Sequence, residues 1–160
     1  MGDRFAAFEK IARIAGTLGT EPGEEPNPQT QTHPFDERNI HSAISEVALN
    51  LFDDGHYSQA TFEAFKYVDK EVKKLANIND SGFKLMMAAF AEAAPKIKLT
   101  ALQNQSEIDE QMGYKFIFAG AMSAIRNPRG HDITTDPIDL CLDHLSFASV
   151  LLRRLEKRQV

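Results

Sequence analysis

The chain has 160 residues, which is enough for one domain with a hydrophobic core but short of two domains of roughly 100–200 residues each. Hydrophobic residues make up 42% and charged residues 26%, as in an average soluble globular protein. With 18 Lys and Arg against 23 Asp and Glu, the net charge of −5 argues against a protein that coats nucleic acid non-specifically, although it leaves room for a local basic cleft.

Several classes of protein are excluded by what the sequence lacks. The single cysteine, Cys141, excludes an internal disulfide framework and a Cys-rich zinc module. No apolar run approaches the roughly 20 residues of a membrane-spanning helix, so we expect no membrane association. The first residues do not form a charged segment followed by an apolar one, so we expect no secretory signal and a cytoplasmic protein.

The N-terminal part divides into two predicted segments. Residues 19–34 contain four prolines and no apolar residue, which is typical of a flexible Pro/Glu-rich linker. Residues 1–18 are predicted to form a short amphipathic helix that docks on the main domain, docks on a partner or frays, because so short a helix is marginal alone. Its apolar face would consist of Phe5, Phe8, Ala12 and Ala15.

Residues 35–160 are predicted to form a helical domain. A first helix should stop at Asp53-Asp54-Gly55, where Gly55 suits a left-handed cap. A second apolar stripe, from Tyr57 to Leu75, has lysines on its polar side. A third, shorter helix around residues 83–90 should end before Pro95.

Two long helices are predicted to complete the domain. One follows an apolar stripe to about Arg126 and should be broken by Asn127-Pro128. Asp136 is expected to cap the last helix, with Asp139 in its first turn. Strand-like alternation is absent, so we predict an all-α bundle of four to five helices whose last two are joined by residues 127–135. The stripe of the penultimate helix consists of Ile108, Met112, Phe116, Ala119 and Met122.

The segment Arg126-Asn127-Pro128-Arg129-Gly130-His131 contains the residues best suited to chemistry. Arginine offers a planar set of donors to phosphate oxygens and keeps its charge at every relevant pH. Histidine can take and give a proton near neutral pH. The pair Arg126 and His131, with Asn127 to orient either group, therefore suits acid–base cleavage of a phosphodiester. The same residues also suit an ordinary helix end, since a cation favours the C-terminal dipole and Asn-Pro is a common stop.

This segment resembles the Arg-x(4–6)-His motif of the HEPN superfamily, and the wider sequence resembles the Ymh-type branch over roughly residues 38–156. The similarity lies in the stretches 51–57, 63–66, 85–90, 113–114, 118–122, 124–131 and 148–155. The resemblance implies a HEPN-like helical bundle that forms a homodimer, with the Arg/His motifs of both copies facing one cleft.

The resemblance also implies a metal-independent endoribonuclease that needs no cofactor, often a toxin or phage-defence effector with an antitoxin or regulatory protein as a partner. Arg126 would bind the scissile phosphate of the RNA, His131 would act as base or acid, and Asn127 would assist. Arg129 and the lysines of the second helix are candidate substrate contacts. The alternative is a noncatalytic dimeric module that binds RNA, a nucleotide or a protein.

The remaining polar candidates are expected to be structural. Asp53, Asp54 and His56 lack the spacing of metal ligands. Cys141 should be a buried thiol, His144 a residue at the core edge or an interface, and His41 a solvated side chain, while His33 falls in the linker.

Overall fold

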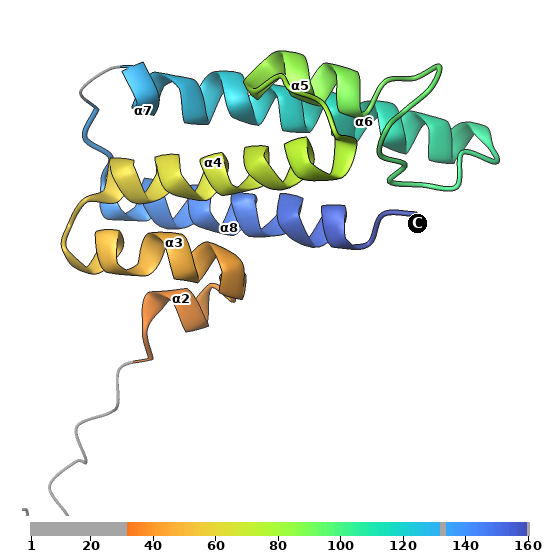
Figure 1. The fold of residues 1–160 in the computed structure, drawn as a ribbon. Coiled ribbons are helices and arrows are strands. Elements are labelled where there is room, and N and C mark those ends of the chain that lie inside the picture. Colours follow the sequence, from red (N-terminus) through yellow and green to blue (C-terminus); the bar gives the residue numbers. More distant parts are fainter. Residues whose placement is uncertain (1–31, 132–133, 160) are drawn as a thin grey trace, which may run out of the picture. The chain divides into compact units, whose positions relative to one another are not determined.

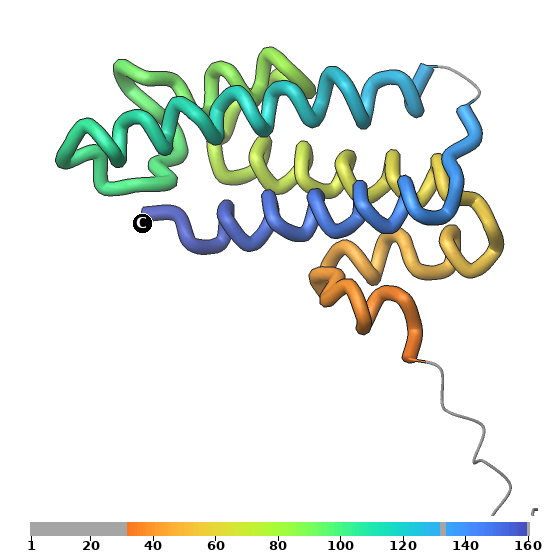
Figure 2. The backbone as a smooth tube through the Cα atoms, turned by 180° about the vertical axis from the view of Figure 1, so that it is seen from behind, coloured from red at the N-terminus to blue at the C-terminus, as the bar shows by residue number. Residues whose placement is uncertain are grey.

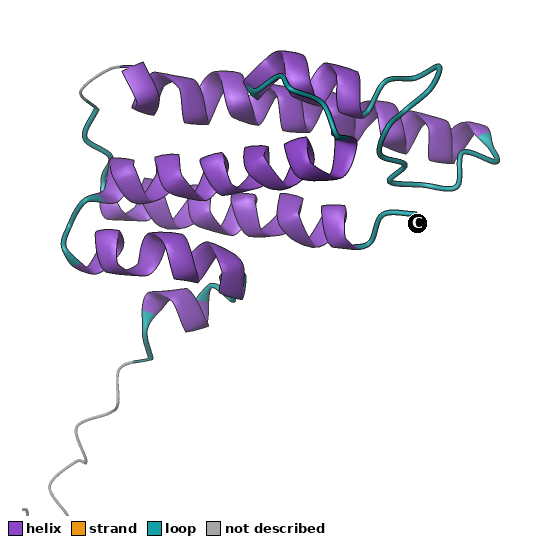
Figure 3. Cartoon of the chain, viewed as in Figure 1, coloured by secondary structure: helices purple, strands orange, loops and turns teal. Residues whose placement is uncertain are grey.

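The computed structural model describes residues 32–131 and 134–159, and in them helices joined by loops are the only regular secondary structure, as predicted (Figure 3). The predicted helix of residues 1–18 and nearly all of the linker lie outside the described residues. The elements are α2 (Pro34–Glu37), α3 (Ser42–Asp53), α4 (Tyr57–Ala76), α5 (Gly82–Ala89), α6 (Gln105–Ala121), the π-helical η1 (Met122–Arg126), α7 (Asn127–His131) and α8 (Ile138–Glu156) (Figure 1).

Helix α4 is the centre of the domain. It packs against α8 and α3 on one side and against α5, η1 and α7 on the other, as both views of the backbone show (Figures 1 and 2). Its core residues recur at the spacing of one helical face, which buries them completely against the neighbouring helices. These fully buried residues include Ala60, Ala64, Val68 and Val72.

The predicted end of the first helix is confirmed. Helix α3 ends at Asp53, and Gly55 follows with a φ of 78°, a conformation that glycine adopts without steric cost. Helix α4 ends at Ala76, and its C-cap residue Asn77 is left-handed. The one-turn helix α2 was not predicted; it begins at Pro34 and buries Phe35.

The predicted break at Asn127-Pro128 is wrong, because the chain continues as a helix through α6, η1 and α7 to His131. The five residues before Asn127 adopt a π-helix, and the Asn127 N–H donates to the Met122 carbonyl, five residues back. Such a widened turn accommodates a proline, whose ring would clash with the carbonyl four residues before it in a regular α-helix. The connection to α8 therefore begins only after His131.

The predicted buried face of α6 is also partly wrong. Ala119 and Met122 are buried as expected, but Ile108 and Phe116 are 41% and 53% exposed. The buried positions are taken instead by Gln111, whose amide bonds to the backbone of the segment between α5 and α6, and by Lys115, which pairs with Glu92. Polar side chains therefore hold two of the buried positions of α6, while Ile108 and Phe116 face outward.

No helix among the described residues is long and apolar enough to cross a membrane. The start of α8 differs from the prediction. Asp139 lies in its first turn as expected, but the N-cap position is Pro137, and Asp136 makes no capping hydrogen bond because its carboxylate points elsewhere.

Candidate functional site

The predicted Arg126–His131 segment forms the end of the long α6–η1–α7 helix. Arg126 is the last residue of η1 and His131 the last residue of α7, where it is exposed. Five residues along a helix correspond to a rise of about 7.5 Å and a rotation of about 140°. In a helix of this geometry the two side chains leave in different directions, and no hydrogen bond joins them among the described residues.

The guanidinium of Arg126 lies toward α4. It sits over the ring of Phe62, 5.4 Å from the ring centroid, and its Nη1 donates to Asn127 Oδ1 at 3.1 Å. Its Nε is buried without a hydrogen-bond partner among the described residues. No carboxylate described here forms an ion pair with Arg126, so its positive charge is not neutralised within this part of the chain.

Asn127 lies beside the start of α5. A Cβ built on Gly82, which has a φ of 61°, would be 3.9 Å from Asn127 Oδ1. The Gly82 N–H donates to the buried carboxylate of Asp69 at 2.6 Å, which fixes this start of α5 to α4. The Asn127 amide, which accepts from Arg126, therefore lies next to the junction of α4 and α5.

Arg129 forms a buried ion pair with Asp136. Its Nε and Nη2 donate to the two carboxylate oxygens at 2.6 and 2.8 Å, and its Nη1 donates to the Ile125 carbonyl at 2.8 Å. Both side chains are less than a tenth exposed. The backbone N–H of Asp136 donates to Ser58 Oγ, which ties the start of α8 to α4. A direct contact of Arg129 with a substrate stays a prediction, but these bonds favour a role in positioning the segment.

Gly130 packs directly against Phe62. A Cβ added to Gly130 would lie 2.7 Å from Cε2 of that ring, closer than any two such atoms can pack. Since the same ring lies under Arg126, Phe62 supports two residues of the candidate segment. Phe62 was missed by the sequence analysis because it lies outside the apolar stripe of α4.

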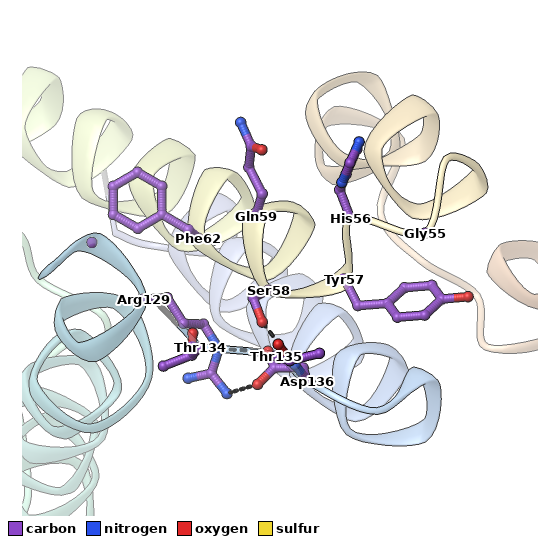
Figure 4. A pocket seen from close by; sticks show the side chains of 11 residues that line it. Gly55, His56, Tyr57, Ser58, Gln59, Phe62, Arg129, Thr134, Thr135 and Asp136 are labelled. Atoms are coloured by element: carbon purple, nitrogen blue, oxygen red, sulfur yellow. Dashed lines mark hydrogen bonds and ion pairs between the residues drawn. The ribbon is translucent and has the colours of Figure 1, made fainter. Parts of the chain in front are cut away.

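A pocket of about 540 Å³ opens between the first turns of α4 and the end of α7 (Figure 4). His56 occupies the N-cap position of α4, and its side chain makes no capping bond to the first N–H groups of the helix. The lining residues are Gly55, His56, Tyr57, Ser58, Gln59, Phe62, Arg129, Gly130, Thr134, Thr135 and Asp136.

Two titratable groups of α8 lie behind this region. Burial raises the pKa of the Cys141 thiol, which is fully buried as predicted. Burial, helped by the charge of Arg129, lowers the pKa of His144 from its ordinary value of 6.5. His144 contacts Phe65 edge-on, and its Nδ1 is buried without a partner among the described residues. Both groups belong to the packing of α8 on α4.

The other histidines have structural positions. His33 and His41 accept the N–H of the residue two further along at the starts of α2 and α3, and pair with Asp53 and Glu156. The expectation that His41 is solvated is wrong, because its side chain is only 14% exposed. No cluster of three or more metal-ligating side chains exists in residues 32–131 and 134–159.

A family model described as "Protein of unknown function (Hypoth_ymh)" matches residues 38–155, which include every helix from α3 to α7 and nearly all of α8. No curated protein and no solved structure matches the chain. Because the match spans well over half of the sequence, the chain belongs to the Hypoth_ymh family.

Proposed function

We propose that this protein is a metal-independent endoribonuclease of the HEPN type, which acts as a homodimer. The observation that carries the proposal is the environment of Arg126, an arginine with no carboxylate partner among the described residues, fixed on Phe62 and Asn127 one short helix away from the exposed His131. A held guanidinium of this kind suits a nonbridging phosphate oxygen.

The reaction needs only groups that the chain and the RNA provide. A base removes the proton of the ribose 2′-hydroxyl, the 2′-oxygen attacks phosphorus, and the bond from phosphorus to the 5′-oxygen breaks while an acid protonates that oxygen. The products are a 2′,3′-cyclic phosphate and a 5′-hydroxyl. His131 supplies the base or the acid, and Arg126 stabilises the charge that develops on the phosphate.

The homodimer completes the site. Positions 126 and 131 are about 140° apart around a regular helix, so a second copy that faces this segment would bring the Arg126 of one chain and the His131 of the other to one cleft. Helix α6 continues directly into the candidate segment. Its outward face carries the exposed side chains of Phe116 and Ile117. Gly120, with open space beside it, would allow a second helix to approach closely. We place the contact between the two copies on this face.

The test is cleavage of RNA by the purified protein in excess EDTA. We expect 2′,3′-cyclic phosphate ends from the wild type and none from His131→Ala. The control is His33→Ala. It removes an imidazole that pairs with Asp53, outside the candidate segment, so this variant should cleave RNA normally. Equal cleavage by wild type and His131→Ala would contradict the assignment.

A role as a toxin or phage-defence effector, held in check by an antitoxin or regulatory protein, is part of the same proposal. Expression of the wild type should slow cell growth and expression of His131→Ala should not. If the protein binds RNA or a nucleotide without turnover, and His131→Ala leaves that binding unchanged, the noncatalytic dimeric module is the correct alternative.

A further inference from the structure

The pocket at the start of α4 adjoins the candidate segment and has no part in the bond-breaking steps described above. Arg129 and Gly130 line it, and so does Phe62, whose ring also lies under the guanidinium of Arg126. A group bound in the pocket could therefore lie against the same aromatic ring that supports the guanidinium of Arg126. Such closeness suits neighbouring parts of one nucleotide chain.

The lining of the pocket suits a nucleoside. The ring of Phe62 offers an apolar surface for a base, and stacking on aromatic side chains is a principal source of affinity for single-stranded RNA. The amide of Gln59 and the hydroxyls of Thr134 and Thr135 offer donors and acceptors for base edges and a ribose hydroxyl. The Thr134 hydroxyl oxygen is buried and has no partner among the described residues.

The charge of the pocket also suits a unit of an RNA chain. Among the described residues that line the pocket, Asp136 is the only carboxylate, and Arg129 neutralises it through two hydrogen bonds. The described lining therefore carries no net negative charge that would repel a phosphate backbone. The volume of about 540 Å³ falls within the roughly 300–1,000 Å³ typical of small-molecule sites.

We propose that this pocket binds the nucleoside unit next to the scissile phosphate, with its base against Phe62 and its polar edge toward Gln59 and Thr134. This inference rests on the proposed function, since it takes the strand held by Arg126 to be RNA. The pocket then contributes to base preference, which the phosphate contact alone cannot provide.

The binding experiment uses full-length His131→Ala protein, four RNA homopentamers and the four nucleoside 5′-monophosphates. We expect RNA to shift the backbone amide signals of residues 55–62, 130 and 134–136. Adding Gln59→Ala or Thr134→Val should weaken RNA binding at least fivefold and change the order of affinity among the pentamers. Gln103 is an exposed glutamine outside the pocket, so Gln103→Ala is the matched control. This variant should change neither the affinity for RNA nor its order among the pentamers.

Each outcome decides the proposal. Amide shifts confined to other residues, or unchanged affinities in both pocket variants, would overturn it. So would a monophosphate that binds as tightly as RNA, because the pocket would then hold a free nucleotide. Failure of the proposed function looks different: wild-type protein would not cleave RNA while the pocket signals still shift. If the wild type cleaves and both pocket variants cut the same sites at the same rate, only the pocket proposal is wrong.

Discussion

Gly130 lies so close to the ring of Phe62 that any side chain at position 130 would overlap it. Arg126 and Lys66 also contact this ring, and their charged groups lie 5.4 and 5.5 Å from its centroid. A side chain at position 130 would therefore have to displace the ring, and the end of α7 and the Arg126 guanidinium both pack on the same aromatic side chain.

Gly130→Ala should destabilise the protein by about 1 kcal/mol. Overpacking costs roughly 1–3 kcal/mol, while replacing a helical glycine regains up to about 1 kcal/mol. The rate of RNA cleavage should fall by more than this loss of stability alone would cause, because a displaced Phe62 moves Arg126. Urea unfolding and initial cleavage rates measure the two effects.

Gly113→Ala is the matched control for this change. Gly113 lies within α6 with nothing inside 4 Å of an added Cβ, so the variant should be more stable by about 0.5–1 kcal/mol. If Gly130→Ala behaved in the same way, the proposed dependence on Phe62 would be wrong.

Asp136→Asn should destabilise the protein strongly. The carboxylate and Arg129 are 6% and 9% exposed, so the substitution leaves a buried guanidinium without its counter-charge, which typically costs about 3–5 kcal/mol. The double variant Arg129→Met with Asp136→Leu removes both charges and should recover most of the loss. A double-mutant cycle on urea unfolding measures the coupling, and additive effects would show that the pair is not coupled.

The sequence was sufficient to predict most of the helices but not the partners of their polar side chains. Stop signals such as Asp53-Asp54-Gly55 are local, and α3 ends there. The pairing of Asp136 with Arg129 depends on how two helix ends meet, so Asp136 was taken for a cap. The sequence also does not predict the helix through Pro128. The π-helical turn that accommodates the proline does not change the periodicity of the apolar residues.

The Cys141 thiol should react only when the protein unfolds. It is fully buried, and burial raises its pKa, so the reactive thiolate is scarce and inaccessible in the native state. Its reaction with a disulfide reagent at pH 8 should be slow in buffer and immediate in denaturant. Rapid stoichiometric reaction of the native protein would show that α8 opens readily from α4.

Phe116→Glu should convert the proposed dimer to a monomer. The side chain is 53% exposed in one copy and would be buried between two, where a carboxylate is costly. Light scattering at micromolar concentration should give a dimer for the wild type and a monomer for the variant, with loss of cleavage. Val150→Glu, at an equally exposed apolar position on α8, is the control and should stay dimeric. A monomeric wild type would rule out the shared cleft.

The stability of the protein should fall on acidification because of His144. Burial, and then the charge of Arg129, lower the pKa of His144, while Asp136 and Asp143 oppose this shift. The unfolded chain therefore binds the proton more readily than the folded one. The free energy of unfolding is unaffected by this group above about pH 6.5 and decreases as the pH falls below that value toward the lower pKa of the folded state. Urea unfolding between pH 7.5 and 5 should show this decrease, and His144→Gln should flatten it. An equal slope in the variant would assign the pH dependence to other groups.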